Sequence, residues 1–109
     1  MFEPMIEWLD SQGYEILEQH RGHERGTDIV ALKDGKRLLI ELKGKSAAKD
    51  VDFGTEIYQI MKQMKVPAED YAIGVTDDYK TLVSRCMMPL RKLRIKMFMI
   101  NEREVNQLW

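Results

Sequence analysis

The spacing of apolar residues along the chain predicts an alternation of helices and strands. Near the N-terminus apolar residues recur at i, i+3, i+4 and i+7, which predicts a helix over residues 2–13 that ends at Gly13. Residues 14–20 are predicted to form the first strand. The nearly continuous apolar run over residues 71–76 is typical of a buried strand. The core-facing residues of the first helix are expected to be Phe2, Met5, Ile6 and Leu9.

Residues 26–43 carry the clearest local signal, because two short apolar-rich runs flank the pair Asp34-Gly35. Asp-Gly in this setting predicts a hairpin with a two-residue type I′ turn. The turn fixes the register, so Asp28 is expected to lie directly opposite Glu41. Such non-hydrogen-bonded pairs hold their Cβ atoms roughly 4.5–5.5 Å apart. Lys43 follows two residues after Glu41 and is expected on the same face, diagonal to Asp28.

The remaining segments complete the order of elements. A helix is predicted from Asp52 or Thr55 to about residue 65, a second from Asp77 to about residue 88 with an interruption at Pro89, and a strand over residues 94–100. A turn and a short edge strand are expected over residues 101–109. The apolar stripe of the first of these helices is Phe53, Ile57, Ile60, Met61 and Met64. The chain is therefore expected to be an α/β protein with an αβββαβ core, a mixed central sheet flanked by helices, and a C-terminal helix and strand.

Length and composition limit the class of protein. The chain has 109 residues, of which 44% are hydrophobic and 32% charged, and we expect one domain over residues 1–109. The single Cys86 excludes an internal disulfide framework. No apolar run is long enough to span a bilayer, and no basic segment precedes an apolar one at the N-terminus. We expect a cytoplasmic protein without a membrane partner.

The charge is nearly balanced overall but unevenly distributed. The formal net charge is −1 and the pI is about 6.1, which lacks the basic excess of many DNA-binding proteins. Residues 1–41 contain five Lys/Arg and nine Asp/Glu, whereas residues 42–109 contain twelve and nine. Within the second segment, residues 85–96 hold a run of basic residues without an intervening acid. This run is either a solvated face or a phosphate-facing patch.

The predicted pairing of Asp28 with Glu41 calls for a cation, because two carboxylates directly opposite each other repel. Lys43 supplies one as part of an ordinary salt-bridge cluster. A divalent ion such as Mg²⁺ is a second solution, since Mg²⁺ is typically held by one or two carboxylates together with water and substrate phosphate. Lys43 is then placed to orient a water molecule or to balance the charge of a phosphate.

The spacing of Asp28, Glu41, Leu42 and Lys43 resembles the signature of the PD-(D/E)XK nuclease superfamily, and the flanking runs are similar to archaeal Holliday-junction resolvases and to Mrr-type and RecB-type nuclease domains. Thr27 stands where the pattern has proline. The resemblance implies a restriction-endonuclease-like fold and a metal-dependent endonuclease acting on DNA. It also implies Mg²⁺ or Mn²⁺ bound by Asp28, Glu41 and the backbone at Leu42, with Lys43 as a catalytic residue, and a homodimer with two symmetric sites.

Further site residues are expected from the helices and loops. The resemblance implies a supporting acid on the first helix, for which Glu7 is the first choice and Glu3 the second, and a supporting glutamine on the later helix, Gln59 before Gln63. A solvent-facing glutamate is an equal interpretation of Glu7. The cations placed near the proposed site, and so expected to bind nucleic acid, are Arg21, Arg25, Lys45 and Lys49.

Two other interpretations stay open. The chain can be a non-catalytic module that binds nucleic acid or protein and keeps the nuclease fold with a structural salt-bridge cluster. Alternatively, the hairpin pattern is a chance match in an ordinary α/β domain. The sequence contains no Walker A loop, dinucleotide-binding glycine motif, paired-cysteine zinc motif or serine-hydrolase elbow, so it gives no support to those chemistries.

Overall fold

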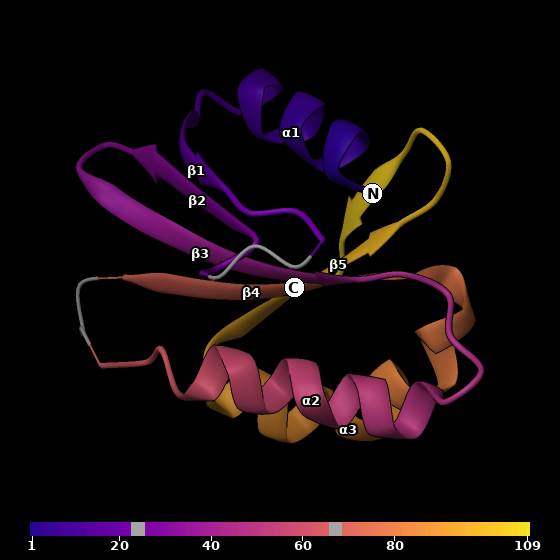
Figure 1. Ribbon diagram of the computed structural model, residues 1–109. Helices are drawn as coiled ribbons and strands as arrows, with labels where there is room; N and C mark the ends of the chain where they lie inside the picture. The colour runs from indigo at the N-terminus through magenta and orange to yellow at the C-terminus, as the bar shows by residue number, and fades with distance from the viewer. Residues whose placement is uncertain (23–25, 66–68) are drawn as a thin grey trace.

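The computed structural model describes residues 1–22, 26–65 and 69–109 of the chain, and within them it is a mixed α/β fold (Figure 1). A six-stranded sheet is flanked by three α-helices, as the sequence predicts. The elements in chain order are α1 (Phe2–Ser11), β1 (Glu15–Gln19), β2 (Ile29–Lys33), β3 (Lys36–Lys43), α2 (Lys49–Met61), β4 (Asp70–Thr76), a 3₁₀ turn (Asp77–Tyr79), α3 (Lys80–Lys92), β5 (Ile95–Ile100) and β6 (Val105–Gln107).

The strands lie side by side in chain order, from β1 to β6. β3, β4 and β5 run parallel to one another, and the other neighbouring pairs are antiparallel. The crossovers that parallel strands require are supplied by α2 and α3, which cover one face of the sheet, while α1 covers the other (Figure 1). The predicted αβββαβ order, followed by a helix and a strand, is confirmed.

The β2–β3 hairpin has the predicted register. Ile29 pairs with Ile40, and Lys33 pairs with Lys36 next to the turn. Asp34 and Gly35 have φ angles of 53° and 77°. Two consecutive positive φ values are what a type I′ turn requires, and Asp and Gly are among the residues that tolerate them best. The hairpin therefore brings the start of β2 beside the end of β3.

Each face of the sheet has its own apolar core, because successive strand residues point to opposite sides. Ile29 and Ile40 pack with Met5 and Leu9 of α1. On the other face, a second cluster collects Val30, Leu39, Phe53, Ile60 and Val83 beneath α2 and α3. Because Leu39 belongs to the second cluster, the period of two directs Glu41 and Lys43 toward α2 as well.

α2 begins at Lys49, earlier than the predicted start at Asp52 or Thr55. The backbone N–H of Ala48 donates a hydrogen bond to the Ser46 hydroxyl, 3.0 Å away. The chain therefore turns at residues 46–48, before Asp52. Asp50 and Asp52 consequently lie in the first turn, where negative charge interacts favourably with the helix dipole. Met61 was predicted to belong to the buried apolar stripe of this helix, but its side chain is 46% exposed.

α3 continues through Pro89 to Lys92, so the predicted interruption is wrong. Pro89 lies on the exposed side of the helix, where the carbonyl group that it leaves without a donor can face solvent. The buried Leu90 anchors the following turn, and the N–H of Leu93 donates to the Pro89 carbonyl at 3.0 Å. Packing of the last turn against the core therefore outweighs the local effect of proline.

The C-terminal segment forms the predicted short edge strand, β6, and then returns to the core. The indole N–H of Trp109 donates to the Ile95 carbonyl at 2.8 Å, and the Arg91 guanidinium lies 6.0 Å from its ring centroid. Among the described residues, no helix has both the length and the apolar character needed to cross a membrane.

Candidate metal centre

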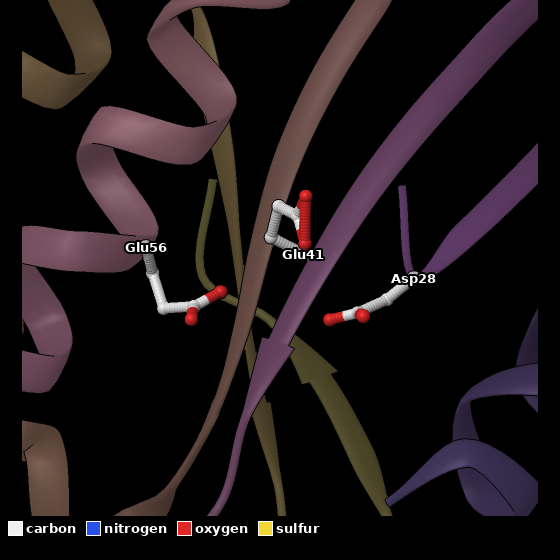
Figure 2. Close-up of side chains that lie close together, drawn as sticks. All are labelled: Asp28, Glu41 and Glu56. Carbon is white, nitrogen blue, oxygen red and sulfur yellow. The ribbon is translucent and has the colours of Figure 1, made fainter. Parts of the chain in front are cut away.

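Three carboxylates from separate elements converge beside the sheet. Asp28 immediately precedes β2, Glu41 lies in β3 and Glu56 lies in α2, and Figure 2 shows their side chains directed toward one another. One oxygen from each carboxylate lies within 4.8 Å of the others. Because the hairpin register pairs the first two and the crossover through α2 brings in the third, the fold itself assembles the cluster.

Asp28 is oriented by the backbone of the opposite strand. The N–H of Leu42 donates a hydrogen bond of 2.7 Å to Oδ2 of Asp28. Burial raises the pKa of the Asp28 carboxyl, while this amide acts in the opposite direction by stabilising the charged form. Asp28 and Glu41 also share a side-chain hydrogen bond, so the two carboxyl groups are in direct contact.

Glu41 is only 6% exposed and is held by a chain of two side-chain hydrogen bonds. The amide Nε2 of Gln63 donates to Oε1 of Glu41 at 2.9 Å. The hydroxyl of Thr27 donates to Oε1 of Gln63 at 2.6 Å, which fixes the orientation of that amide. Burial and the negative charge of Asp28 raise the pKa of Glu41 to about 8.

Glu56 provides the clearest sign that a group is needed at this position. It is 9% exposed, and its Oε2 is buried and has no hydrogen-bond partner among the described residues. Burial, followed by the charge of Asp28, raises the pKa of Glu56 to about 7. A buried carboxylate oxygen without a partner is unfavourable unless a proton or a cation compensates it.

The donor set fits a hard divalent cation. Carboxylate oxygens are the ligands that Mg²⁺ and Mn²⁺ prefer, and no soft ligand is part of this group. A bound cation would offset the mutual repulsion of the three carboxylates and satisfy the buried oxygen of Glu56. The residues present therefore fit the metal that the sequence predicts.

Lys43 lies at the edge of the same site. Its side chain is 39% exposed, and Nζ lies 4.0 Å from Oδ2 of Asp52 in α2. The charge of Lys43 also lowers the pKa values of Asp28 and Glu56, in opposition to burial. The ammonium group thus faces the carboxylates while Asp52 holds it at the rim.

A surface cavity of about 510 Å³ opens over the cluster. The cavity is lined by the three carboxylates and Lys43, and by Thr55, Gln59 and Lys62. The lining of the cavity therefore combines three carboxylates with the cations of Lys43 and Lys62. Such a distribution suits an anion that approaches a metal ion.

Some of the residues predicted for the site lie elsewhere. Glu7 is exposed on α1, which covers the opposite face of the sheet, so the helix-borne acid of the cluster is Glu56 instead. Gln59 lines the cavity, but it is Gln63 that donates to Glu41. The backbone of Leu42 reaches the cluster through its N–H, which bonds to Asp28.

The predicted nucleic-acid-binding residues are also dispersed. Arg21 forms an ion pair with Glu3, with Nη1 2.6 Å from Oε1, and its guanidinium lies 4.8 Å from the centroid of the Phe2 ring. Arg25 lies outside the described residues. Lys45 is exposed and lines a different cavity, of about 730 Å³, near the ends of β4 and β5, whereas Lys49 is the first residue of α2.

The place of Glu56 in the carboxylate cluster was not predicted from the sequence, although a signal was present. Glu56, Gln59 and Gln63 recur at i, i+3 and i+7 and form a polar face of α2 apart from its apolar stripe. Glu56 can reach Glu41 only if α2 packs on the face of the sheet to which the Glu41 side chain points. The topology of the fold determines which face α2 covers, and the spacing of polar residues along the helix does not.

Comparison with known proteins supports the fold. No protein-family model matches the sequence, and no curated protein matches it significantly. Among solved structures, the chain is similar to an XisH family protein from Nostoc punctiforme, with a TM-score of 0.69, 16% identity and coverage of 96% of this chain and 94% of that one. It is also similar to an fdxN element excision controlling factor protein from Anabaena variabilis, with a TM-score of 0.68, 18% identity and coverage of 97% and 95%. At these identities the likeness establishes a shared fold over nearly the whole chain.

Proposed function

We propose that this protein is a nuclease that hydrolyses phosphodiester bonds in DNA with Mg²⁺ or Mn²⁺. The observation that carries the proposal is the convergence of Asp28, Glu41 and Glu56 within 4.8 Å, with one buried oxygen of Glu56 lacking a partner among the described residues. The spacing of Asp28, Glu41 and Lys43 resembles the PD-(D/E)XK signature. The mixed sheet and the order of elements agree with the fold that this resemblance implies.

In this proposal each side chain has a defined task. Asp28, Glu41 and Glu56 would hold a divalent ion, which would supply Lewis-acid stabilisation of the negative charge that grows on a phosphate. The Leu42 N–H fixes the orientation of the Asp28 carboxylate, and the Leu42 carbonyl would be a further ligand. Lys43 donates hydrogen bonds from Nζ and thereby orients the attacking water against the scissile phosphate.

The names of the structural neighbours suggest a process in which such an activity would serve. One of them is described as an excision controlling factor. Excision of a DNA segment requires phosphodiester bonds to be broken, so we place the proposed activity in DNA excision or its control. Two symmetric sites in a homodimer would cut both strands, which is the assembly that we propose for this chemistry.

The direct test is cleavage of supercoiled plasmid and of a four-way junction in Mg²⁺ or Mn²⁺. Wild type is compared with Asp28→Ala and Lys43→Ala, and with Asp50→Asn as a control that alters an exposed acid of α2. We expect metal-dependent cutting that both site variants reduce by about a hundredfold or more, which is the range for a lost catalytic group. Asp50→Asn should cut as wild type does.

Two results would count against the nuclease. If wild type cuts neither substrate, or if Lys43→Ala and Asp28→Ala cut as fast as wild type, the site does not catalyse hydrolysis. A module that binds nucleic acid or protein without cutting would then be the better description. Thermal unfolding of each variant separates a loss of chemistry from a loss of folding.

A further inference from the structure

The outer surface of α2 carries a straight row of exposed residues at i, i+4, i+7 and i+11. This row, here called the α2 ridge, consists of Val51, Thr55, Tyr58 and Lys62. The spacing places all of them along one line of the helix and its C-cap. Val51 is 69% exposed and Tyr58 is 63% exposed, so two apolar side chains stand in solvent within a polar row.

The α2 ridge borders the acidic cavity. Thr55 and Lys62 both line that cavity, together with Glu56 and Gln59 from the neighbouring face of the helix. The Lys62 ammonium lies 5.6 Å from the centroid of the Tyr58 ring. The exposed ring of Tyr58 therefore stands beside Lys62, a cation that lines the cavity.

We propose that the α2 ridge binds unpaired nucleotides, with a base stacked on the ring of Tyr58 and a backbone phosphate at Lys62. The inference rests on the proposed nuclease function and narrows its substrate to single-stranded DNA or to DNA with an unpaired segment beside the cut. Base stacking on an exposed aromatic side chain next to a cation is how single strands are held without sequence preference. In a duplex the bases are stacked on each other, so their faces are not free to pack on Tyr58.

A second copy of the chain is a weaker fit to this ridge. A stable interface buries roughly 800 Å² on each partner around an apolar centre that is depleted of charge. The α2 ridge offers only Val51 and Tyr58 as large apolar groups, and Lys62 lies directly against the tyrosine ring. A polyanion with flat apolar faces matches this combination of ring and cation better.

The test measures binding without cleavage. Fluorescence anisotropy of a labelled oligothymidine, and of a duplex of the same length, is recorded in Ca²⁺ for wild type, Tyr58→Ala and Tyr58→Phe. Met88→Ala is the matched control, because Met88 is 68% exposed on α3. We expect Tyr58→Ala to weaken oligothymidine binding by at least about fivefold, the low end for one lost stacked base, with little change for the duplex. Tyr58→Phe and Met88→Ala should bind as wild type does.

Three results would overturn the inference: wild type fails to bind oligothymidine, Tyr58→Ala binds it as tightly as wild type, or Tyr58→Ala loses single-strand and duplex binding equally. Sedimentation of the same proteins identifies a fourth, in which Tyr58→Ala converts a dimer to a monomer without changing oligothymidine binding. Cleavage in Mg²⁺ is scored separately. Tyr58-dependent binding without any cleavage would support the ridge while refuting the nuclease.

Discussion

The side-chain amide of Gln63 donates a 2.9 Å hydrogen bond to Glu41, although Gln63 lies just past the end of α2 and Glu41 lies in the middle of the sheet. Thr27 completes the arrangement by donating to the carbonyl oxygen of the same amide. The link joins the start of the hairpin, the central strand and the end of the helix. The hydrogen bond to one oxygen of Glu41 restricts rotation of the carboxylate and so fixes the direction of its other oxygen.

Loss of this link should reduce stability. We expect Gln63→Ala to lower the free energy of unfolding by about 1–2 kcal/mol, because it leaves a buried carboxylate oxygen and the Thr27 hydroxyl without their partner. Gln59→Ala is the control, since Gln59 lines the same cavity from the adjacent turn. Urea unfolding of the three proteins makes the measurement. Equal stabilities for Gln63→Ala and wild type would show that the hydrogen bond carries no net stabilisation.

Stability without divalent ions should fall as the pH rises from about 5 to 8. The pKa is raised from 4.5 to about 8 for Glu41 and to about 7 for Glu56, so the folded protein retains protons that the unfolded chain has already released. In this window each group lowers the free energy of unfolding by up to about 1.4 kcal/mol per pH unit. Urea unfolding in EDTA at several pH values tests the sign. Glu56→Gln should flatten the slope below pH 7, whereas a stability that rises over this window would contradict the raised pKa values.

Divalent ions should bind where the carboxylates converge. We expect Mn²⁺ to raise the melting temperature of wild type, since a ligand that binds only the folded state stabilises it. The shift should grow between pH 6.5 and 8.5, because the ion must displace protons from Glu41 and Glu56. Glu56→Gln should weaken Mn²⁺ binding about tenfold or more in calorimetry, and Asp50→Asn should not. Undiminished Mn²⁺ binding by Glu56→Gln would remove that residue from the ligand set.

Two glycines offer a matched pair of backbone tests. Gly35 has a φ of +77°, and no atom lies within 4 Å of the point where a Cβ would stand, so Gly35→Ala should destabilise the protein by about 1–2 kcal/mol through backbone strain alone. Gly54 lies inside α2 with equally open space around it, and Gly54→Ala should stabilise by about 0.5–1 kcal/mol. Thermal unfolding shows whether each substitution raises or lowers the stability of the folded protein. A stabilising effect of Gly35→Ala would indicate that Gly35 does not keep its positive φ in solution, and a destabilising effect of Gly54→Ala would contradict the expectation for the helix.

The parts of the site that depend on local geometry were predictable from the sequence. The Asp34-Gly35 turn specifies the register, and the register alone places the start of β2 beside Glu41. The order of elements followed from periodicity in the same way. These features depend on residues near one another in the chain, where turn chemistry and side-chain alternation leave few choices.

The parts that depend on tertiary packing were not predictable in this way. Whether the supporting acid comes from α1 or α2 depends on which helix covers the face that Glu41 points to, and neither Glu7 nor Glu56 carries that information locally. The choice between Gln59 and Gln63 likewise depends on where α2 ends relative to β3. The path of α3 through Pro89 was decided by the burial of Leu90, which local propensity does not register.

The short turn between β2 and β3 also bears on how the cluster comes into being. Hairpins with two-residue turns close within about 1–10 μs, whereas docking of a helix onto a sheet waits for collapse of the larger chain. We therefore expect Asp28 and Glu41 to be neighbours early in folding and Glu56 to join them late. During synthesis, a nascent chain that has emerged only as far as the hairpin would carry two of the three carboxylates and would gain the last one only after α2 had left the ribosome and packed.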